Sequence, residues 1–248
     1  MKIYLKLILS STLLTISSCD VINETLNNVN LPNNNESTEN PLSNAEVVSG
    51  LKEALNVGIK NAVDVTSVTD GFLGNSEIKI PFPESANKMK EWAENKPLFS
   101  DKVTKITETL NRAAEDAAKE ATPIFINAIK NMSISDGFDI LNGGEGAATK
   151  FLKDNTKSEL VTAFSPKVQA SIEKVKLTDY WEAVMTKYNQ AMLITGGEKI
   201  ETDLNKYVTE RAITGLFLMV EKEENKIRKD PVAQVTDILK RVFGSLLK

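Results

Sequence analysis

Five charged residues have spacings that would place carboxylate and guanidinium groups on shared helix faces. Arg112 and Glu115 are three residues apart, and Glu224 and Arg228 are four apart with Glu221 one turn earlier. If the two helices pack together, Arg112, Glu115 and Glu221 could meet at the edge of the core. Buried pairs of carboxylates have split pKa values and suit acid–base catalysis or cation binding. A structural network of ion pairs explains the same spacing, and we favour that interpretation.

A second candidate is the segment near residues 77–83, which has the pattern of an extended chain. Ile78 and Ile80 flank Lys79, and Pro81 follows, so a helix is excluded here. The segment could be a strap over a ligand or an edge that docks a partner, with Lys79 directed away from the two isoleucines. A packed connection held by proline is the simpler interpretation, and we favour it.

The composition excludes several kinds of chemistry. The 248 residues include no histidine and one cysteine, Cys19. Without histidine there is no Ser-His-Asp or Cys-His catalysis and no histidine-ligated zinc. One cysteine, if it is committed to a lipid, leaves no disulfide and no thiolate metal site. We therefore expect no metal and no cofactor, and the formal net charge of −4 predicts no nucleic-acid partner.

Cys19 closes a short apolar stretch near the start of the chain. Two lysines precede the apolar run Leu7–Ile16, which is too short to span a hydrocarbon core of about 30 Å and is typical of a signal peptide. Ile16-Ser-Ser-Cys19 resembles the lipobox of bacterial lipoproteins, whose cysteine is diacylated before cleavage. The resemblance implies a signal peptide over residues 1–18 and a lipid, such as palmitate, on Cys19. An ordinary signal-peptidase site is the alternative.

Residues 19–44 join this anchor to the rest of the chain. They are rich in asparagine and lack apolar periodicity, which predicts a disordered tether. A flexible coil of about 25 residues has a span of roughly 25–30 Å, so we expect the domain to stand clear of the head groups of its membrane. Asp20 resembles an inner-membrane retention signal of some bacteria and a surface-export signal of others. Both remain open, although we expect the outer membrane or cell surface of the bacterial envelope in preference to the inner membrane.

From residue 45 to 248 the apolar residues recur every three or four positions, which predicts one all-α, bundle-like domain. The run Leu216–Val220 is apolar on all sides and predicts a buried central helix near residues 208–228. Gly215 within it predicts a close contact, which we place against the alanines around Ala113–Ala117. The expected helices are 44–68, 84–94, 100–121, 122–132, 135–141, 147–152, 156–175 with a kink or break at Pro166, 179–192, 204–228, and a terminal helix from Pro231.

Short motifs extend over nearly the whole predicted domain. In chain order they are Asp70-Gly-Phe72, Ile78-Lys-Ile-Pro81, Leu110-Asn-Arg-Ala-Ala-Glu115, Ile124-Phe125, Ala147-Ala-Thr149, Gly215-Leu-Phe217 and Ile227-Arg228. In this order they resemble an uncharacterised family of bacterial envelope lipoproteins, a domain of unknown function. The resemblance implies an all-helical fold, and it implies no activity because the family has none assigned.

Two functions from different classes fit these observations. The first is a membrane-anchored, non-enzymatic module that binds an envelope protein or an apolar ligand, and we favour it because no catalytic constellation is present. The alternative is a carboxylate-based hydrolase acting on a cell-envelope polymer. Such an enzyme needs two acids about 5–9.5 Å apart across an open cleft.

Overall fold

The computed structural model describes residues 43–174, 176–200 and 202–230. The chain divides into two compact units, Met1–Pro41 and Leu42–Lys248, and the described residues belong to the second unit. The predicted signal peptide, Cys19, the tether and the terminal helix from Pro231 lie outside the described residues.

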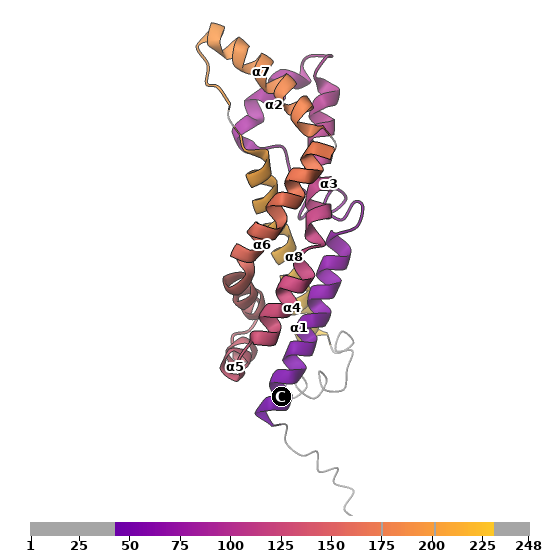
Figure 1. The fold of residues 1–248 in the computed structure, drawn as a ribbon, viewed down its shortest axis with the longest axis vertical. Coiled ribbons are helices and arrows are strands. Elements are labelled where there is room, and N and C mark those ends of the chain that lie inside the picture. The colour runs from indigo at the N-terminus through magenta and orange to yellow at the C-terminus, as the bar shows by residue number, and fades with distance from the viewer. Residues whose placement is uncertain (1–42, 175, 201, 231–248) are drawn as a thin grey trace, which may run out of the picture. The chain divides into compact units, whose positions relative to one another are not determined.

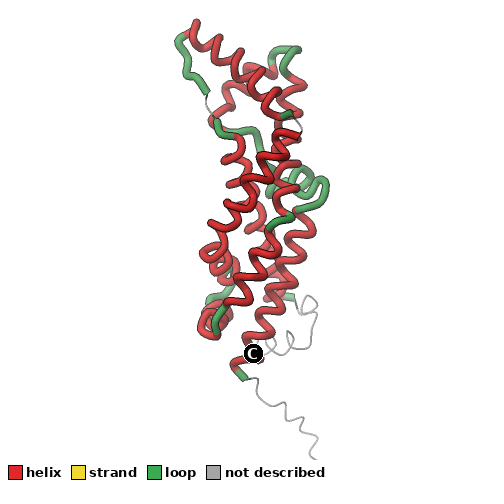
Figure 2. Tube along the Cα trace, viewed as in Figure 1, coloured by secondary structure: helices red, strands yellow, loops and turns green. Residues whose placement is uncertain are grey.

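The described part of the chain is all-α and contains no strand, which confirms the predicted fold class (Figures 1 and 2). The elements are α1 Asn44–Thr66, the 3-10 helix η1 Glu84–Ala86, α2 Asn87–Glu94, α3 Ser100–Ala118, α4 Ala121–Asn131, α5 Ile134–Asn142, α6 Ala147–Lys174, α7 Leu177–Thr195 and α8 Leu204–Lys229. Within this part of the chain, no helix is both long enough and apolar enough to cross a membrane.

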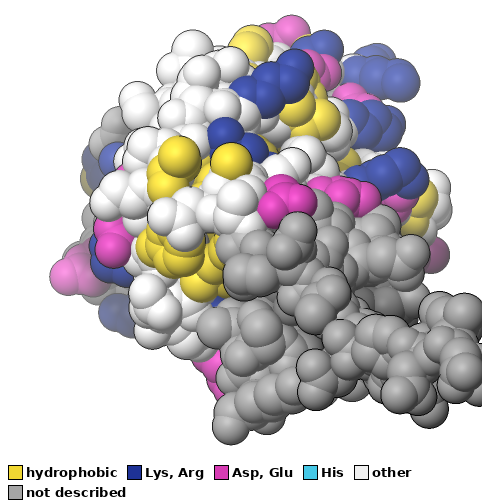
Figure 3. All heavy atoms as spheres, turned by 90° about the horizontal axis from the view of Figure 1, so that it is seen from below, with side chains coloured by type: hydrophobic (Ala, Val, Ile, Leu, Met, Phe, Trp, Pro, Cys, Tyr) yellow, Lys and Arg dark blue, Asp and Glu magenta, His cyan; other side chains and the backbone are white. Residues whose placement is uncertain are grey.

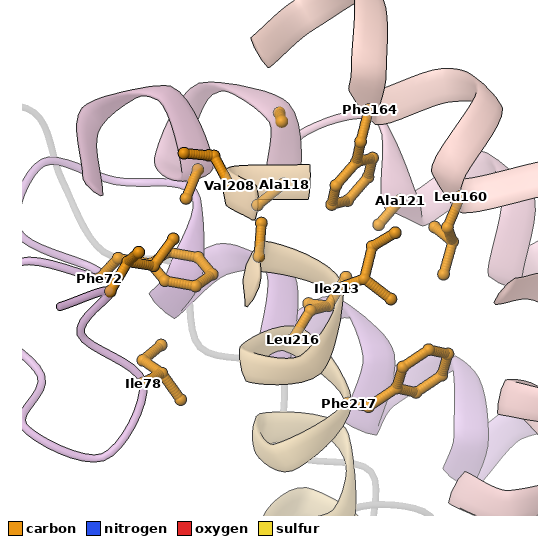
Figure 4. Packing of buried hydrophobic residues seen from close by; sticks show 14 of the residues in the cluster. Phe72, Ile78, Ala118, Ala121, Leu160, Phe164, Val208, Ile213, Leu216 and Phe217 are labelled. Atoms are coloured by element: carbon orange, nitrogen blue, oxygen red, sulfur yellow. The ribbon is translucent and has the colours of Figure 1, made fainter. Parts of the chain in front are cut away.

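Helix α8 is the centre of the domain, as its apolar run predicts. It packs against α1, α3 and α6, and α6 also packs against α3 and α4. Figure 4 shows Leu216 of α8 between Ile78 on one side and Leu160 of α6 on the other. Phe217 of α8 meets Phe125 of α4 edge to face, with ring centroids 5.6 Å apart. The core is therefore built around the middle of this helix, where Gly215, Leu216, Phe217 and Val220 are buried.

Capping boxes begin two of the described helices. The Ser43 side chain accepts a hydrogen bond from the Glu46 N–H, and Glu46 in turn accepts from the Ser43 N–H, so a capping box begins α1. Ser133 and Asp136 form the same arrangement at the start of α5. The two hydrogen bonds from Ser133 hold the pKa of the Asp136 carboxyl below its ordinary value, with the backbone N–H as the larger cause.

The prediction of two separate helices, 147–152 and 156–175, is wrong, and the helix does not break at Pro166. Residues 147–174 form one helix that contains Pro166. Thr156 does not cap a helix, because its hydroxyl is buried and donates to the Leu152 carbonyl at 2.6 Å. A proline inside a helix costs about 3 kcal/mol, but Phe164 and Val168 on either side are fully buried. We infer that their packing keeps the helix continuous through the exposed proline.

The prediction of which residues Gly215 contacts is also wrong. A Cβ atom at Gly215 would lie 2.8 Å from Cε1 of Phe72 and 3.1 Å from Cβ of Ile78. The close approach is therefore to the loop between α1 and η1, and not to the alanines of α3. In Figure 4, Phe72 and Ile78 lie together on one side of α8. A side chain at position 215 would displace this loop.

Candidate functional site

Glu115 is the centre of the first cluster of predicted site residues. Its side chain is 6 % exposed. One carboxylate oxygen accepts hydrogen bonds from the N–H groups of Phe72 and Leu73, at 3.1 and 3.2 Å, and the other accepts from Arg112 at 2.8 Å. Arg112 also donates to Asp70 at 2.8 Å. The carboxylate is thus occupied on both oxygens.

The local backbone explains how the loop meets Glu115. Asp70 has a φ of +66°, a left-handed conformation that non-glycine residues adopt infrequently. The chain turns there, and the next N–H groups in sequence after Gly71 point at Glu115. The hydrogen bonds from Arg112 to Glu115 and to Asp70 raise the pKa of Arg112 above its ordinary value. The cluster therefore holds the loop against α3 with a charged clasp.

A polar pocket of about 230 Å³ opens beside this clasp, between the end of α1, the middle of α3 and the end of α6. Its charged lining residues are Arg112, Glu115, Asp116, Lys119 and Lys174. Both signs of charge are present, so the pocket does not favour a strongly charged ligand of either sign.

Asp116 at the rim of this pocket is held in its ionised form. Lys119 donates to it at 2.8 Å and the Ser171 hydroxyl at 3.1 Å. These contacts, with the Lys119 hydrogen bond the largest cause, lower the pKa of the Asp116 carboxyl below its ordinary value. A carboxyl of this kind is a poor proton donor at neutral pH, because it remains ionised there.

Glu224 is the centre of the second cluster. Its side chain is 5 % exposed. One oxygen accepts from the Ala148 N–H at 3.0 Å and from Arg228, while the other accepts from the N–H and hydroxyl of Thr149 at 2.9 and 2.8 Å. Arg228 also donates to the Ile140 carbonyl. Glu224 therefore caps the start of α6 from another helix, where the N–H groups lack intrahelical partners.

The five predicted residues are thus divided between two places. Arg112 pairs with Glu115 in the first cluster, and Arg228 pairs with Glu224 in the second. Glu221 is exposed on α8, with its carboxylate beside Gly146 at the start of α6. No hydrogen bond or ion pair among the described residues joins Glu221 to Glu115 or Arg112, so the expected meeting of the three does not form. A role in ligand binding stays a prediction for all five.

The extended segment is a packed connection. Ile78 and Ile80 are buried, whereas Lys79 and Pro81 are exposed, which is the predicted alternation. The side-chain amide of Asn111 in α3 accepts from the Ile80 N–H at 2.8 Å and donates to the Ile80 carbonyl at 2.9 Å. Sequence reasoning missed Asn111, although a polar residue on the apolar face of a predicted helix is a signal of such a role. The function of the segment as a strap or docking edge stays a prediction.

The described interior offers little space for an apolar ligand. A pocket between α1 and α8, lined by residues such as Leu51, Leu55 and Ile227, has a volume of about 20 Å³. Holding a single water takes roughly 10–15 Å³, so an acyl chain would need the helices to separate. No group of three or more Asp, Glu, His or Cys residues in the described ranges is arranged to hold a metal ion.

Replacing Glu115 by Gln tests whether the first clasp is structural. Both oxygens of Glu115 only accept, so the amide NH₂ would face a donor in either orientation. We expect the free energy of unfolding to fall by about 1.5–3 kcal/mol, measured by urea denaturation. Glu108→Gln, an exposed site on the same helix, should change it by less than about 0.5 kcal/mol. Equal stability of the two variants would show that the hydrogen bonds of Glu115 do not stabilise the domain.

Comparisons with known proteins give one match. The profile of the family described as "Protein of unknown function (DUF4197)" matches residues 41–244. No curated protein matches the chain, and no solved structure matches it.

Proposed function

The chain belongs to this family of unknown function, and from that premise we propose that it is a lipid-anchored protein of the bacterial envelope whose helical domain is a non-enzymatic binding or interaction module. The Cys19 sequence supports the anchor. The observation behind the non-enzymatic role is that both buried carboxylates are already hydrogen-bonded on each oxygen within the protein.

Glu115 and Glu224 are the buried acids of the described domain. Each accepts hydrogen bonds from two backbone N–H groups and one arginine. A general acid or base must reach the proton that it transfers, and neither carboxylate can do so while both of its oxygens are occupied. A partner would therefore bind at the polar pockets of the surface, where side chains are accessible.

A hydrolase of cell-envelope polymer remains the second candidate. The observation that favours it is a groove between α4, α5 and α6, which is lined by several exposed carboxylates. Incubating the purified chain with a soluble envelope glycan and measuring new reducing ends tests this candidate. Turnover that is lost on replacing a groove carboxylate by its amide would support the hydrolase over the binding module.

Replacing Cys19 by Ser tests the anchor. We expect radiolabelled palmitate to be incorporated into the native chain and not into Cys19→Ser, because the serine hydroxyl is not diacylated. We also expect the variant to leave the membrane fraction, since two or three acyl chains give stable anchoring. Asp20→Asn should keep the label. Palmitate that remains on Cys19→Ser, or a native chain without label, would contradict the anchor.

A further inference from the structure

The motifs do not explain a polar groove between α4, α5 and α6. It consists of two adjoining pockets of about 460 and 310 Å³. Both pockets are lined by Asp136, Phe151 and Asn155, so they form one continuous surface. Figure 3 views the domain from the end at which α5 lies and shows apolar, acidic and basic side chains interleaved there.

One aromatic residue, Phe151, lines the groove. Phe151 is half-buried and packs against the core on one side. Phe151 lines both pockets, so it lies where the two pockets adjoin. An aromatic ring at the floor of a polar groove offers a flat apolar surface to a ligand that is itself partly apolar.

Three asparagines line the same pocket as Phe151. Asn127 and Asn131 come from α4 and Asn155 from α6. Asn155 donates to the Phe151 carbonyl at 2.8 Å, which fixes its side chain and leaves its amide oxygen toward other donors. Asn127 and Asn131 are exposed and joined by one long contact of 3.5 Å. Amides both donate and accept hydrogen bonds, so these side chains can bind hydroxyl groups as donors or as acceptors.

The carboxylates of the groove are mostly paired within the protein. Asp136 accepts the hydrogen bonds that cap α5, Asp154 pairs with Lys150, and Glu145 pairs with Lys229. For the side chains of Asp139 and Glu159, no hydrogen bond or ion pair with another described residue is present. The groove therefore repels polyanions, and the unpaired carboxylates of Asp139 and Glu159 can accept hydrogen bonds from hydroxyl groups.

We propose that this groove binds a neutral oligosaccharide, an inference that rests on the proposed function as an envelope binding module. The C–H face of a sugar ring would lie on Phe151, and its hydroxyl groups would pair with the amides of Asn127, Asn131 and Asn155. Glu159, on the turn of α6 after Asn155, would accept from a further hydroxyl. A sugar satisfies the apolar and the polar parts of the groove together, whereas a basic peptide would use mainly the carboxylates.

The test uses the purified full chain in a detergent without a sugar head group, and tri-N-acetylchitotriose as a neutral probe. Isothermal titration calorimetry should show binding that changes little between 50 and 500 mM salt, because the contacts are uncharged. Phe151→Ala should weaken binding at least about tenfold, which is 1.4 kcal/mol. Phe138→Ala is the matched control, since Phe138 is a half-buried phenylalanine of α5 that lines neither pocket.

A second variant keeps the proposal testable if Phe151→Ala fails to fold. Asn127→Ala replaces an exposed side chain, so its helical circular dichroism and melting curve should match those of the native chain while its affinity for the probe falls. Binding that is equal in all variants, or absent in the native chain, would overturn the proposal. So would binding of trilysine, lost at high salt, without binding of the sugar. Each of these results leaves the palmitate test of the anchor unchanged, so the two proposals fail separately.

Discussion

Replacing Glu224 by Gln should lower the free energy of unfolding by about 3–5 kcal/mol, the usual cost of breaking a buried ion pair. The two side chains have nearly the same size, so the effect would come from hydrogen bonding. Every contact to Glu224, from Ala148, Thr149 and Arg228, is a donated hydrogen bond. The amide NH₂ of Gln would face a donor in either orientation. Arg228, whose side chain is 13 % exposed, would lose its carboxylate partner.

Urea denaturation followed by circular dichroism measures this effect, and Glu221→Gln is the matched control. Glu221 lies one turn before Glu224 on the same helix and is exposed, so its replacement should change stability by less than about 0.5 kcal/mol. Hydrogen exchange at the Ala148 and Thr149 amides should also accelerate in Glu224→Gln, because these N–H groups begin α6 and lose their acceptor. If the two variants are equally stable, Glu224 does not cap α6.

Replacing Asn111 by Leu is expected to have the second largest effect, a loss of about 2–4 kcal/mol. Asn111 is fully buried, and its amide satisfies both backbone groups of Ile80. Leu fills a similar volume but pairs with neither group, and each buried group that loses its partner costs about 1–3 kcal/mol. The loss should appear in the urea midpoint and in proteolysis of the segment around Ile80, which would be released from α3.

Two further variants of this kind separate the hydrogen bonds from side-chain size. Asn111→Asp keeps an acceptor for the Ile80 N–H but places an oxygen against the Ile80 carbonyl, so it should also destabilise the domain. Asn56→Leu, on the exposed face of α1, should change stability by less than about 0.5 kcal/mol. Full stability of Asn111→Leu would contradict the role given to this amide.

Much of the fold was predictable because it depends on local spacing. Apolar residues at intervals of three and four define helix faces whatever those faces pack against, and they predicted α1, α3, α4 and α8 to within a few residues. The alternation of Ile78, Lys79 and Ile80 likewise predicted which side chains are buried. The break at Pro166 was predicted wrongly, because the penalty of proline is local whereas the burial of Phe164 and Val168 that offsets it is tertiary.

The candidate site was predictable only in its parts. The spacing of Arg112 and Glu115, and of Glu224 and Arg228, predicted an ion pair within each helix, and both pairs are present. The other partners come from distant segments: the Phe72 and Leu73 amides for Glu115, and the Ala148 and Thr149 amides for Glu224. Backbone amides carry no sequence signal that identifies their acceptor.

The sequence by itself therefore determined most of the helices and buried faces, although not the continuity of α6, and the exclusion of histidine and disulfide chemistry, since each follows from residue type and short-range spacing. Only the tertiary structure decided what each buried polar or glycine residue meets. Gly215 meets Phe72 and Ile78, and Asn111 meets Ile80. The physical reason is that a close contact or a buried hydrogen bond depends on the orientation of two elements in space, and helix periodicity fixes the face of an element but not its neighbour.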